Sequence, residues 1–131
     1  MIDVTAAVIR SGNRILICRR PEGDTFGGLW EFPGGKTEAG ESPEEGLRRE
    51  IREELEMDIS VGERLGSFSY GPEPDGIALT AYHAVPRERS DFVLREHAEA
   101  RWIAPEDLDR FAFAPADRPF VALLRSGENP R

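Results

Sequence analysis

The sequence predicts an α/β fold in which a mixed β-sheet is flanked by helices. Two observations lead to this prediction. Short β-rich runs are spread over most of the chain, and one strongly signalled helix lies among them. The length of 131 residues suits one domain with one sizeable core, so we expect residues 1–131 to form a single unit.

The first two β-rich runs cover residues 3–10 and 14–19. The Ser-Gly-Asn connection between them, residues 11–13, is typical of a hairpin turn. A loop rich in glycine and proline is expected from Pro21 to Gly40, interrupted by the apolar patch at residues 29–32.

The helix that follows has a clear start signal. Ser42 is a candidate N-cap, Pro43 suits the first helical position, and Glu45 completes a capping box. Apolar side chains then recur every fourth residue, at Leu47, Ile51 and Leu55. This spacing gives the helix one apolar stripe, which we expect to pack on the sheet.

The second half of the chain predicts further strands and two short helical segments. Strand-like runs cover residues 61–70 and 76–85, and the Gly-Pro-Glu-Pro-Asp-Gly segment between them is turn chemistry. A short strand is expected near residues 100–103, followed by a helical turn that opens at Pro105. The last helix is expected within residues 116–124, started by Asp117 or a neighbour.

Composition predicts a folded protein of the cytoplasm. Apolar residues make up 39% of the chain and charged residues 32%, and the longest apolar runs are far too short to span a bilayer. The first ten residues lack the pattern of a signal peptide. Cys18 is the single cysteine and sits in an apolar run, so we expect an inert core thiol in a reducing compartment.

The net charge of −8 and the pI near 4.8 argue against a nucleic acid polymer as partner. An anionic ligand would need a metal cation or a local basic pocket. The sequence leaves open whether the protein is a monomer or a homodimer.

Residues 49–57 hold four glutamates and two arginines. Part of this helix resembles a solvated face, in which opposite charges pair four residues apart. The expected pairs are Glu44 with Arg48, Glu45 with Arg49, and Arg52 with Glu56.

Three other carboxylates, those of Glu50, Glu53 and Glu54, span a wedge of about 100° beside the apolar stripe. Glu50 and Glu54 have no basic residue three or four positions away, whereas Glu53 has Arg49. Like charges at these spacings cost about 0.2–0.5 kcal/mol per pair, and partial burial raises that cost. A divalent cation would offset it. The alternative is a face that is solvated or paired with distant basic groups.

Glycines precede this helix at positions 34, 35 and 40, around Lys36. Such residues let a backbone approach a ligand or expose a carbonyl. The competing interpretation is a merely flexible loop.

Together these residues resemble the Nudix box, G-x5-E-x7-R-E-U-x-E-E-x-G-U, where U is apolar. The match runs through Gly35, Glu41, Arg49, Glu50, Ile51, Glu53, Glu54 and Met57. Six fixed positions coincide by chance on the order of 10⁻⁸ per start point. Glu56 stands where the family has glycine, so the helix end either accepts strain of about 1 kcal/mol or the helix runs on.

Similarity extends to most of residues 3–124. The segments 28–36 (GLWEFPGGK), 95–102 (REHAEARW) and 111–119 (FAFAPADRP) resemble the MutT-type branch of nucleoside triphosphate pyrophosphohydrolases. The resemblance implies the Nudix α/β/α sandwich with a mixed β-sheet.

The resemblance also implies a metal site. Glu50, Glu53 and Glu54 would ligate Mg²⁺, or Mn²⁺ in its place, together with a backbone carbonyl of Gly34 or Gly35. Glu96 resembles the extra acid drawn from a later loop, either a metal ligand or a general base, with a surface acid as the alternative. The catalytic residues implied are Glu50, Glu53 and Glu96. Arg49 would orient the glutamates, and Glu41 would brace the loop against the helix.

The substrate-binding residues implied are Arg20, Glu31, Phe32, Pro33, Gly34 and Asp117. Arg20 resembles the residue that meets the triphosphate or sugar. Phe32, with Leu29 and Trp30, would line a base pocket, although each also suits the core.

The reaction implied is Mg²⁺-dependent hydrolysis of a nucleoside triphosphate to monophosphate and pyrophosphate. Asp117 replaces the asparagine of MutT-type members, and an ionised aspartate only accepts hydrogen bonds. It should favour an exocyclic amine such as N4 of cytosine. This resembles the CTP pyrophosphohydrolase branch, and 8-oxo-dGTP is a second candidate. Asp117 as a simple helix cap is the competing interpretation.

Two other functions stay open. Some Nudix enzymes that act on ADP-ribose carry a proline near the position of Pro72, which also suits a turn. A non-catalytic nucleotide-binding module is expected to have lost box glutamates, and Glu50, Glu53 and Glu54 are all present. The sequence does not separate nucleotide-pool sanitation, a DNA-repair role, from pyrimidine metabolism.

Overall fold

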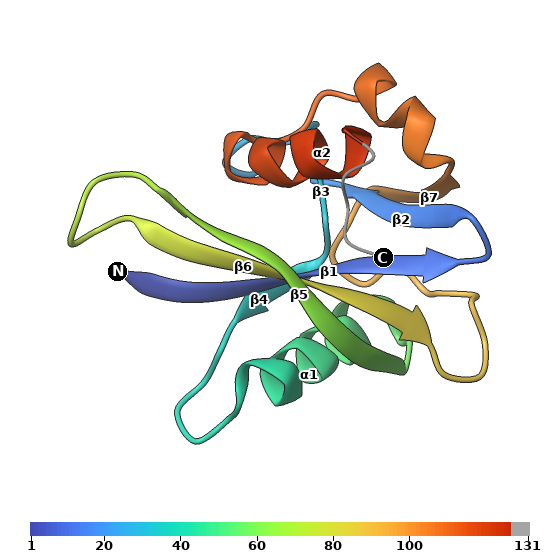
Figure 1. The fold of residues 1–131 in the computed structure, drawn as a ribbon, viewed down its shortest axis with the longest axis horizontal. Helices are drawn as coiled ribbons and strands as arrows, with labels where there is room; N and C mark the ends of the chain where they lie inside the picture. The colour runs from blue at the N-terminus through green and yellow to red at the C-terminus, as the bar shows by residue number, and fades with distance from the viewer. Residues whose placement is uncertain (127–131) are drawn as a thin grey trace.

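The computed structural model describes residues 1–126, and Figure 1 shows their arrangement. Seven strands among them form one mixed sheet. The order of the main path is β3 (Trp30–Glu31), β2 (Arg14–Arg19), β1 (Ile2–Ser11), β6 (Ile77–Pro86) and β5 (Ile59–Tyr70). Strand β4 (Gly34–Lys36) also pairs with β1, and β7 (Glu99–Ile103) pairs with β2. The β1–β6 pair is parallel and the other pairs are antiparallel.

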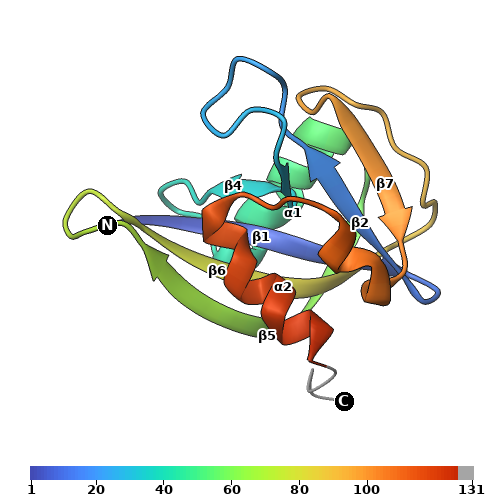
Figure 2. The ribbon, with the colours of Figure 1, turned by 90° about the horizontal axis from the view of Figure 1, so that it is seen from above.

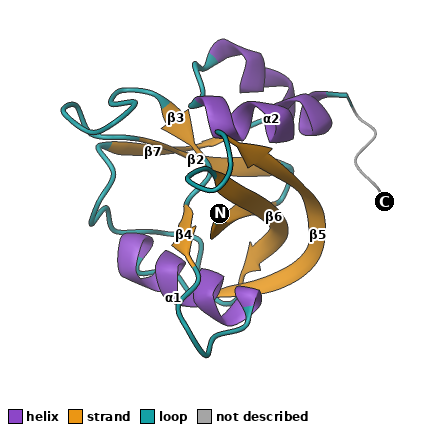
Figure 3. Ribbon diagram, turned by 90° about the vertical axis from the view of Figure 1, so that its left-hand side faces the viewer, coloured by secondary structure: helices purple, strands orange, loops and turns teal. Residues whose placement is uncertain are grey.

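Helices cover both faces of the sheet. Helix α1 (Pro43–Leu55) lies on one side, and the 3-10 helices η1 (Pro105–Arg110) and η2 (Pro115–Asp117) and helix α2 (Arg118–Arg125) lie on the other (Figure 3). Figure 2 shows α2 crossing over the part of the sheet formed by β6 and β5. The predicted α/β/α sandwich with a mixed sheet is confirmed.

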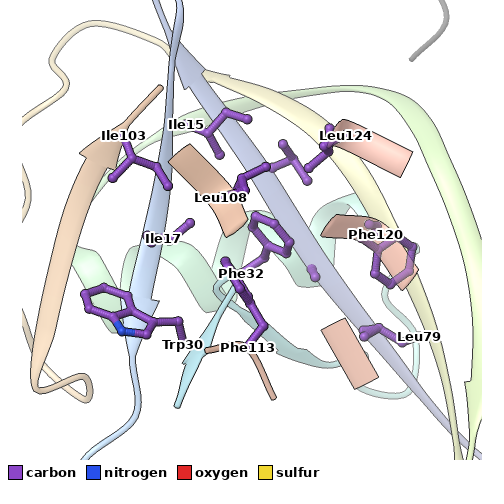
Figure 4. Packing of buried hydrophobic residues seen from close by; sticks show 13 residues of the cluster. Ile15, Ile17, Trp30, Phe32, Leu79, Ile103, Leu108, Phe113, Phe120 and Leu124 are labelled. Carbon is purple, nitrogen blue, oxygen red and sulfur yellow. The ribbon is translucent and has the colours of Figure 1, made fainter. Parts of the chain in front are cut away.

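Successive residues of the central strands enter two different cores, because strand side chains alternate between faces. Ile15 and Ile17 pack in the cluster beneath η1 and α2, whereas Leu16 and Cys18 pack beneath α1. Strands that are buried on both faces therefore have continuous apolar sequences rather than alternating apolar and polar residues. Figure 4 shows the first cluster, in which Phe32 lies beside Phe113 and Leu108.

The helix signals of the sequence are confirmed at the start of α1. The Ser42 hydroxyl accepts from the Glu45 N–H at 3.1 Å, and the Ser42 N–H donates to the Glu45 carboxylate at 2.9 Å. The N-terminal hairpin and the helical turn at Pro105 are also present. Helix α1 ends at Leu55, and Glu56 adopts the left-handed conformation with φ 53° and ψ 38°.

One local expectation was wrong. Residues 34–36 form a strand paired with β1, rather than part of a loop. The last helix starts where it was expected, with Asp117 at the N-cap position and Arg118 as its first residue, although the Asp117 side chain makes no capping bond. The single-domain prediction for residues 1–131 includes 127–131, which lie outside the described residues, and it stays a prediction. Within the described chain, no helix has the length and apolar character needed to cross a membrane.

Candidate active site

A pair of carboxyl groups lies where α1 packs on the sheet. Glu54 is only 5% exposed, and burial together with the adjacent Glu50 raises its pKa to about 10. The charges of Glu96 and Glu31 act in the same direction. Glu54 Oε1 has no hydrogen-bond partner among the described residues. A buried oxygen without a partner costs free energy, and a ligand that binds it would recover that cost.

Glycines allow this pair to approach β4. A Cβ atom at Gly35 would lie 2.4 Å from the carboxyl carbon of Glu50, and one at Gly34 would lie 2.0 Å from the carbonyl oxygen of Thr5. The Thr5 hydroxyl donates to the Gly35 carbonyl at 3.3 Å. The merely flexible loop was therefore the wrong interpretation, because β4 is an ordered strand that needs glycine to fit between β1 and Glu50.

Arg49 holds several of the carboxylates by its guanidinium fork. It donates to Glu41 at 2.6 and 3.1 Å, to Glu50 at 3.2 Å and to Glu53 at 3.3 Å. Glu50 therefore has a basic partner that the spacing argument missed. A search restricted to residues three and four positions apart overlooks a long arginine that curls back on its immediate neighbour.

The three ion pairs expected on the solvated face are replaced by contacts with residues beyond the helix. Arg48 and Arg52 both donate to Asp58, at 3.3 and 3.2 Å. Glu45 forms the capping box, and Glu56 pairs with Arg95. Partners supplied by the tertiary fold displaced the local ones.

The carboxylate oxygens of the box are the type of ligand that a hard divalent cation prefers, but they are not already arranged around an ion site. Glu54 offers a buried carboxyl oxygen without a partner, and Glu50 stands beside it. Glu53 is half exposed and lies toward Arg49. Across residues 1–126, no three acidic, histidine or cysteine side chains are already spaced for an ion. The metal-ligand set therefore remains a prediction.

A cavity of about 910 Å³ adjoins this pair. Seven of the predicted site residues line it: Arg20, Glu31, Phe32, Gly34, Glu54, Glu96 and Asp117. Pro33, Gly35, Glu50 and Glu53 are not part of its lining. The turn between β5 and β6 contributes Pro72 and Asp75, and β5 contributes Tyr70. Sequence reasoning missed these three positions as site residues, because only the folded sheet brings the hairpin to the cavity.

Glu31 is clamped by two basic side chains. Arg20 Nη1 and His97 Nε2 each lie 2.8 Å from one of its oxygens. Burial acts to raise the Glu31 pKa, but the hydrogen bonds from His97 and Arg20 outweigh it and lower the pKa. The ionised carboxylate can only accept, so His97 Nε2 donates the hydrogen bond. Arg20 also donates to the Thr25 carbonyl and to Asp24, and its predicted role toward the substrate stays a prediction.

His97 was missed by sequence reasoning, although it directly follows Glu96. Its side chain is 5% exposed, and Nδ1 has no hydrogen-bond partner in the described part of the chain. A histidine next to a candidate acid was the available signal.

Asp117 is buried, lines the cavity, and makes no side-chain bond to the start of α2. Burial and the charge of Glu31 raise its pKa well above the ordinary value, while the Phe32 N–H donates to it. This shift favours the neutral carboxyl, which both donates and accepts, and the acceptor-only role of Asp117 toward a base stays a prediction. Phe32 and Trp30 both belong to the first core cluster, and Phe32, whose ring centroid lies 5.3 Å from that of Phe113, also lines the cavity, whereas Trp30 does not.

Comparisons with known proteins identify the family of this chain. A model of the NUDIX domain matches residues 1–124. The chain is 40% identical over 121 residues to the CTP pyrophosphohydrolase of Escherichia coli K12, covering 92% of this chain and 89% of the relative. It is 33% identical over 125 residues to the 8-oxo-dGTP diphosphatase of Haemophilus influenzae, covering 95% and 91%.

A solved structure shares the whole fold. The E. coli ORF135 protein superposes with a TM-score of 0.86 at 37% identity, covering 100% of this chain and 93% of that one. The box residues of α1, the sandwich that positions them and these relatives lead to one conclusion. The chain belongs to the Nudix family and is a Nudix hydrolase.

Proposed function

We propose that this protein hydrolyses nucleoside triphosphates to monophosphate and pyrophosphate with a divalent cation, Mg²⁺ or Mn²⁺. The candidate substrates are CTP, modified dCTP and 8-oxo-dGTP, and the candidate role is sanitation of the cytoplasmic nucleotide pool. One observation carries the proposal: the buried Glu54, with the partly buried Glu50 beside it, lines a cavity that Phe32 and Asp117 also line. The named activities of the two relatives support it.

The residues that would hold the cation are Glu50, Glu53, Glu54 and Glu96, with a carbonyl of Gly34 or Gly35. When bound, a divalent cation neutralises phosphate charge and stabilises the charge that develops during hydrolysis. A chain of net charge −8 repels a triphosphate without such compensation. Glu53 would have to leave Arg49 to join the other two carboxylates, and Arg49 keeps Glu41 as a partner when it does.

Proton transfer falls to a carboxylate at the cavity. Glu50 or Glu96 would accept a proton from the attacking water, whose oxygen forms the new bond to phosphorus as the phosphoanhydride bond breaks. Arg49 orients Glu50 for this step through its 3.2 Å contact. The balanced reaction consumes one water and yields nucleoside monophosphate, pyrophosphate and a proton.

Base selection would lie with Asp117. The Phe32 N–H fixes one side of its carboxyl group, which leaves the other lone pairs and the proton for the base edge. An ionised carboxyl suits the amine of cytosine, and a neutral one also suits the adjacent carbonyl and N–H of 8-oxoguanine. The raised pKa of Asp117 therefore favours a site that accepts both kinds of nucleotide.

The test is a substrate panel of CTP, dCTP, 5-methyl-dCTP, 8-oxo-dGTP and ADP-ribose, with phosphorus NMR to identify the products. We expect pyrophosphate and the monophosphate from the triphosphates with Mg²⁺, and no turnover in EDTA. Cleavage of ADP-ribose to AMP and ribose phosphate, with triphosphates untouched, would overturn the proposal. The position of Pro72 in the cavity lining keeps ADP-ribose as the second candidate.

A further inference from the structure

The C-terminal end of α1 carries a residue that differs from the box motif. Glu56 occupies the position where the box motif has glycine, and it adopts the left-handed conformation that glycine accepts without strain. Its N–H still makes the helical bond to the Arg52 carbonyl at 3.0 Å, and its left-handed backbone ends the helix here. The carboxylate at this position therefore needs a reason that helix termination alone does not give.

The segment of residues 93–97 docks on this helix end. The Val93 N–H donates to the Leu55 carbonyl at 2.9 Å, and the Arg95 N–H donates to the Glu54 carbonyl at 3.0 Å. Carbonyls at a helix end have no partner within the helix, so these two bonds satisfy them. Arg95 then turns its guanidinium onto the Glu56 carboxylate through Nε and Nη2.

Glu96 follows Arg95 directly and is held from both sides. Before it, Arg95 is tied to Glu56, and after it, His97 is tied to Glu31 at 2.8 Å. Glu96 lines the cavity, and its charge helps to raise the pKa of Glu54. Two side-chain anchors thus hold the position of Glu96 against the box carboxylates, of which one reaches the end of α1 and one reaches β3.

We propose that Glu56 and Arg95 are a positioning pair, which fixes the loop carrying Glu96 against the end of α1 in place of the motif's glycine. This inference rests on the proposed function, because Glu96 serves there as metal ligand or base. The Arg95 side chain is 61% exposed and that of Glu56 is 40% exposed. An ion pair this exposed adds little to folding stability, so its main effect is to restrict where the loop lies.

The test compares Glu56→Gly, Arg95→Ala and the double variant with the wild type. Arg89→Ala is the matched control, since Arg89 also forms an exposed ion pair with a nearby acid, Asp91, in the same connection. Loss of support around a metal site lowers activity about tenfold, so we expect kcat to fall about tenfold with KM nearly unchanged. The double variant should fall no further than either single one, and the control should match the wild type.

Amide hydrogen exchange of the metal-free protein gives a readout independent of turnover. The Val93 and Arg95 amides should exchange faster in Glu56→Gly and Arg95→Ala, and at the wild-type rate in Arg89→Ala. Unchanged exchange and unchanged kcat in both variants would overturn the positioning pair. A wild type without pyrophosphohydrolase activity would overturn the proposed function instead, and the exchange rates would still decide the inference.

Discussion

Two acids that line the same cavity are treated in opposite ways. Glu31 is ionised, because His97 and Arg20 hold one oxygen each and lower its pKa against the effect of burial. Glu54 is driven toward its neutral form, because it is buried beside Glu50 with one oxygen unpartnered. We infer that Glu31 is held in its ionised form by the fold, whereas the buried Glu54 is in an unfavourable state that a cation would relieve. The predicted substrate-binding role of Glu31 stays a prediction.

The largest effect is expected from Glu54→Gln. If the carboxyl holds the cation, turnover of dCTP with Mg²⁺ should fall on the order of a thousandfold, because electrostatic stabilisation of the reaction is lost. The metal-free variant should fold at least as stably as the wild type, because the substitution removes a buried ionisable group. Steady-state kinetics and urea unfolding measure the two effects. Turnover equal to that of the wild type in this variant would contradict the assignment of Glu54 as a metal ligand.

Glu31→Gln, unlike Glu54→Gln, should lower folding stability. Losing one partner of a mostly buried charge pair costs about 2–3 kcal/mol of folding stability, since Arg20 and His97 keep their polar groups but lose the carboxylate. Urea unfolding at pH 7 measures this loss. A variant as stable as the wild type would contradict the assignment of Glu31 as a structural clamp.

Asp117→Asn should change preference more than rate. The amide keeps a donor and an acceptor but can no longer ionise, so at a pH where Asp117 of the wild type is ionised the kcat/KM ratio of 8-oxo-dGTP to dCTP should be about tenfold higher in the variant. Raising the pH should increase the wild-type preference for dCTP, because Asp117 ionises and becomes an acceptor for the cytosine amine. The ratio in Asp117→Asn should not follow pH. A ratio equal to that of the wild type would exclude Asp117 from base recognition.

The smallest effect expected is on the pH dependence of stability. The pKa of Glu54 is about 10 in the folded protein and 4.5 by ordinary value, so between these pH values the unfolded chain binds fewer protons. Stability of the metal-free protein should therefore fall as pH rises through this window. We expect Glu54→Gln to reduce the difference between pH 5.5 and 8.5 by about 1 kcal/mol or more. An identical pH profile would show that Glu54 is not perturbed.

The features of the fold that could be predicted from the sequence are those set by residues close together in the chain. The capping box of Ser42 and Glu45 and the stripe of Leu47, Ile51 and Leu55 depend on neighbours in sequence, and both are present. Strand β4 was missed because its pairing with β1 depends on glycines that fit between distant elements.

The candidate site shows the same division. The Nudix box could be recognised directly, because its residues lie in one continuous stretch of sequence from Gly35 to Met57. The contact of His97 with Glu31 joins residues 66 positions apart, and the contact of Arg95 with Glu56 joins residues 39 apart. No periodicity of one segment encodes such pairs. The burial of Asp117 and its nearness to Glu31, which raise its pKa, exist only in the folded chain, so the sequence could not show this shift.

The claim that Glu54 and Glu50 form the cation site is tested most directly by titrating the metal-free protein with Mn²⁺. Electron paramagnetic resonance of the free ion measures the binding. We expect Glu54→Gln to weaken Mn²⁺ binding at least about tenfold, and Asp117→Asn to bind Mn²⁺ as the wild type does. Equal affinity in the wild type and Glu54→Gln would contradict the claim that the unpartnered carboxyl pair is the cation site.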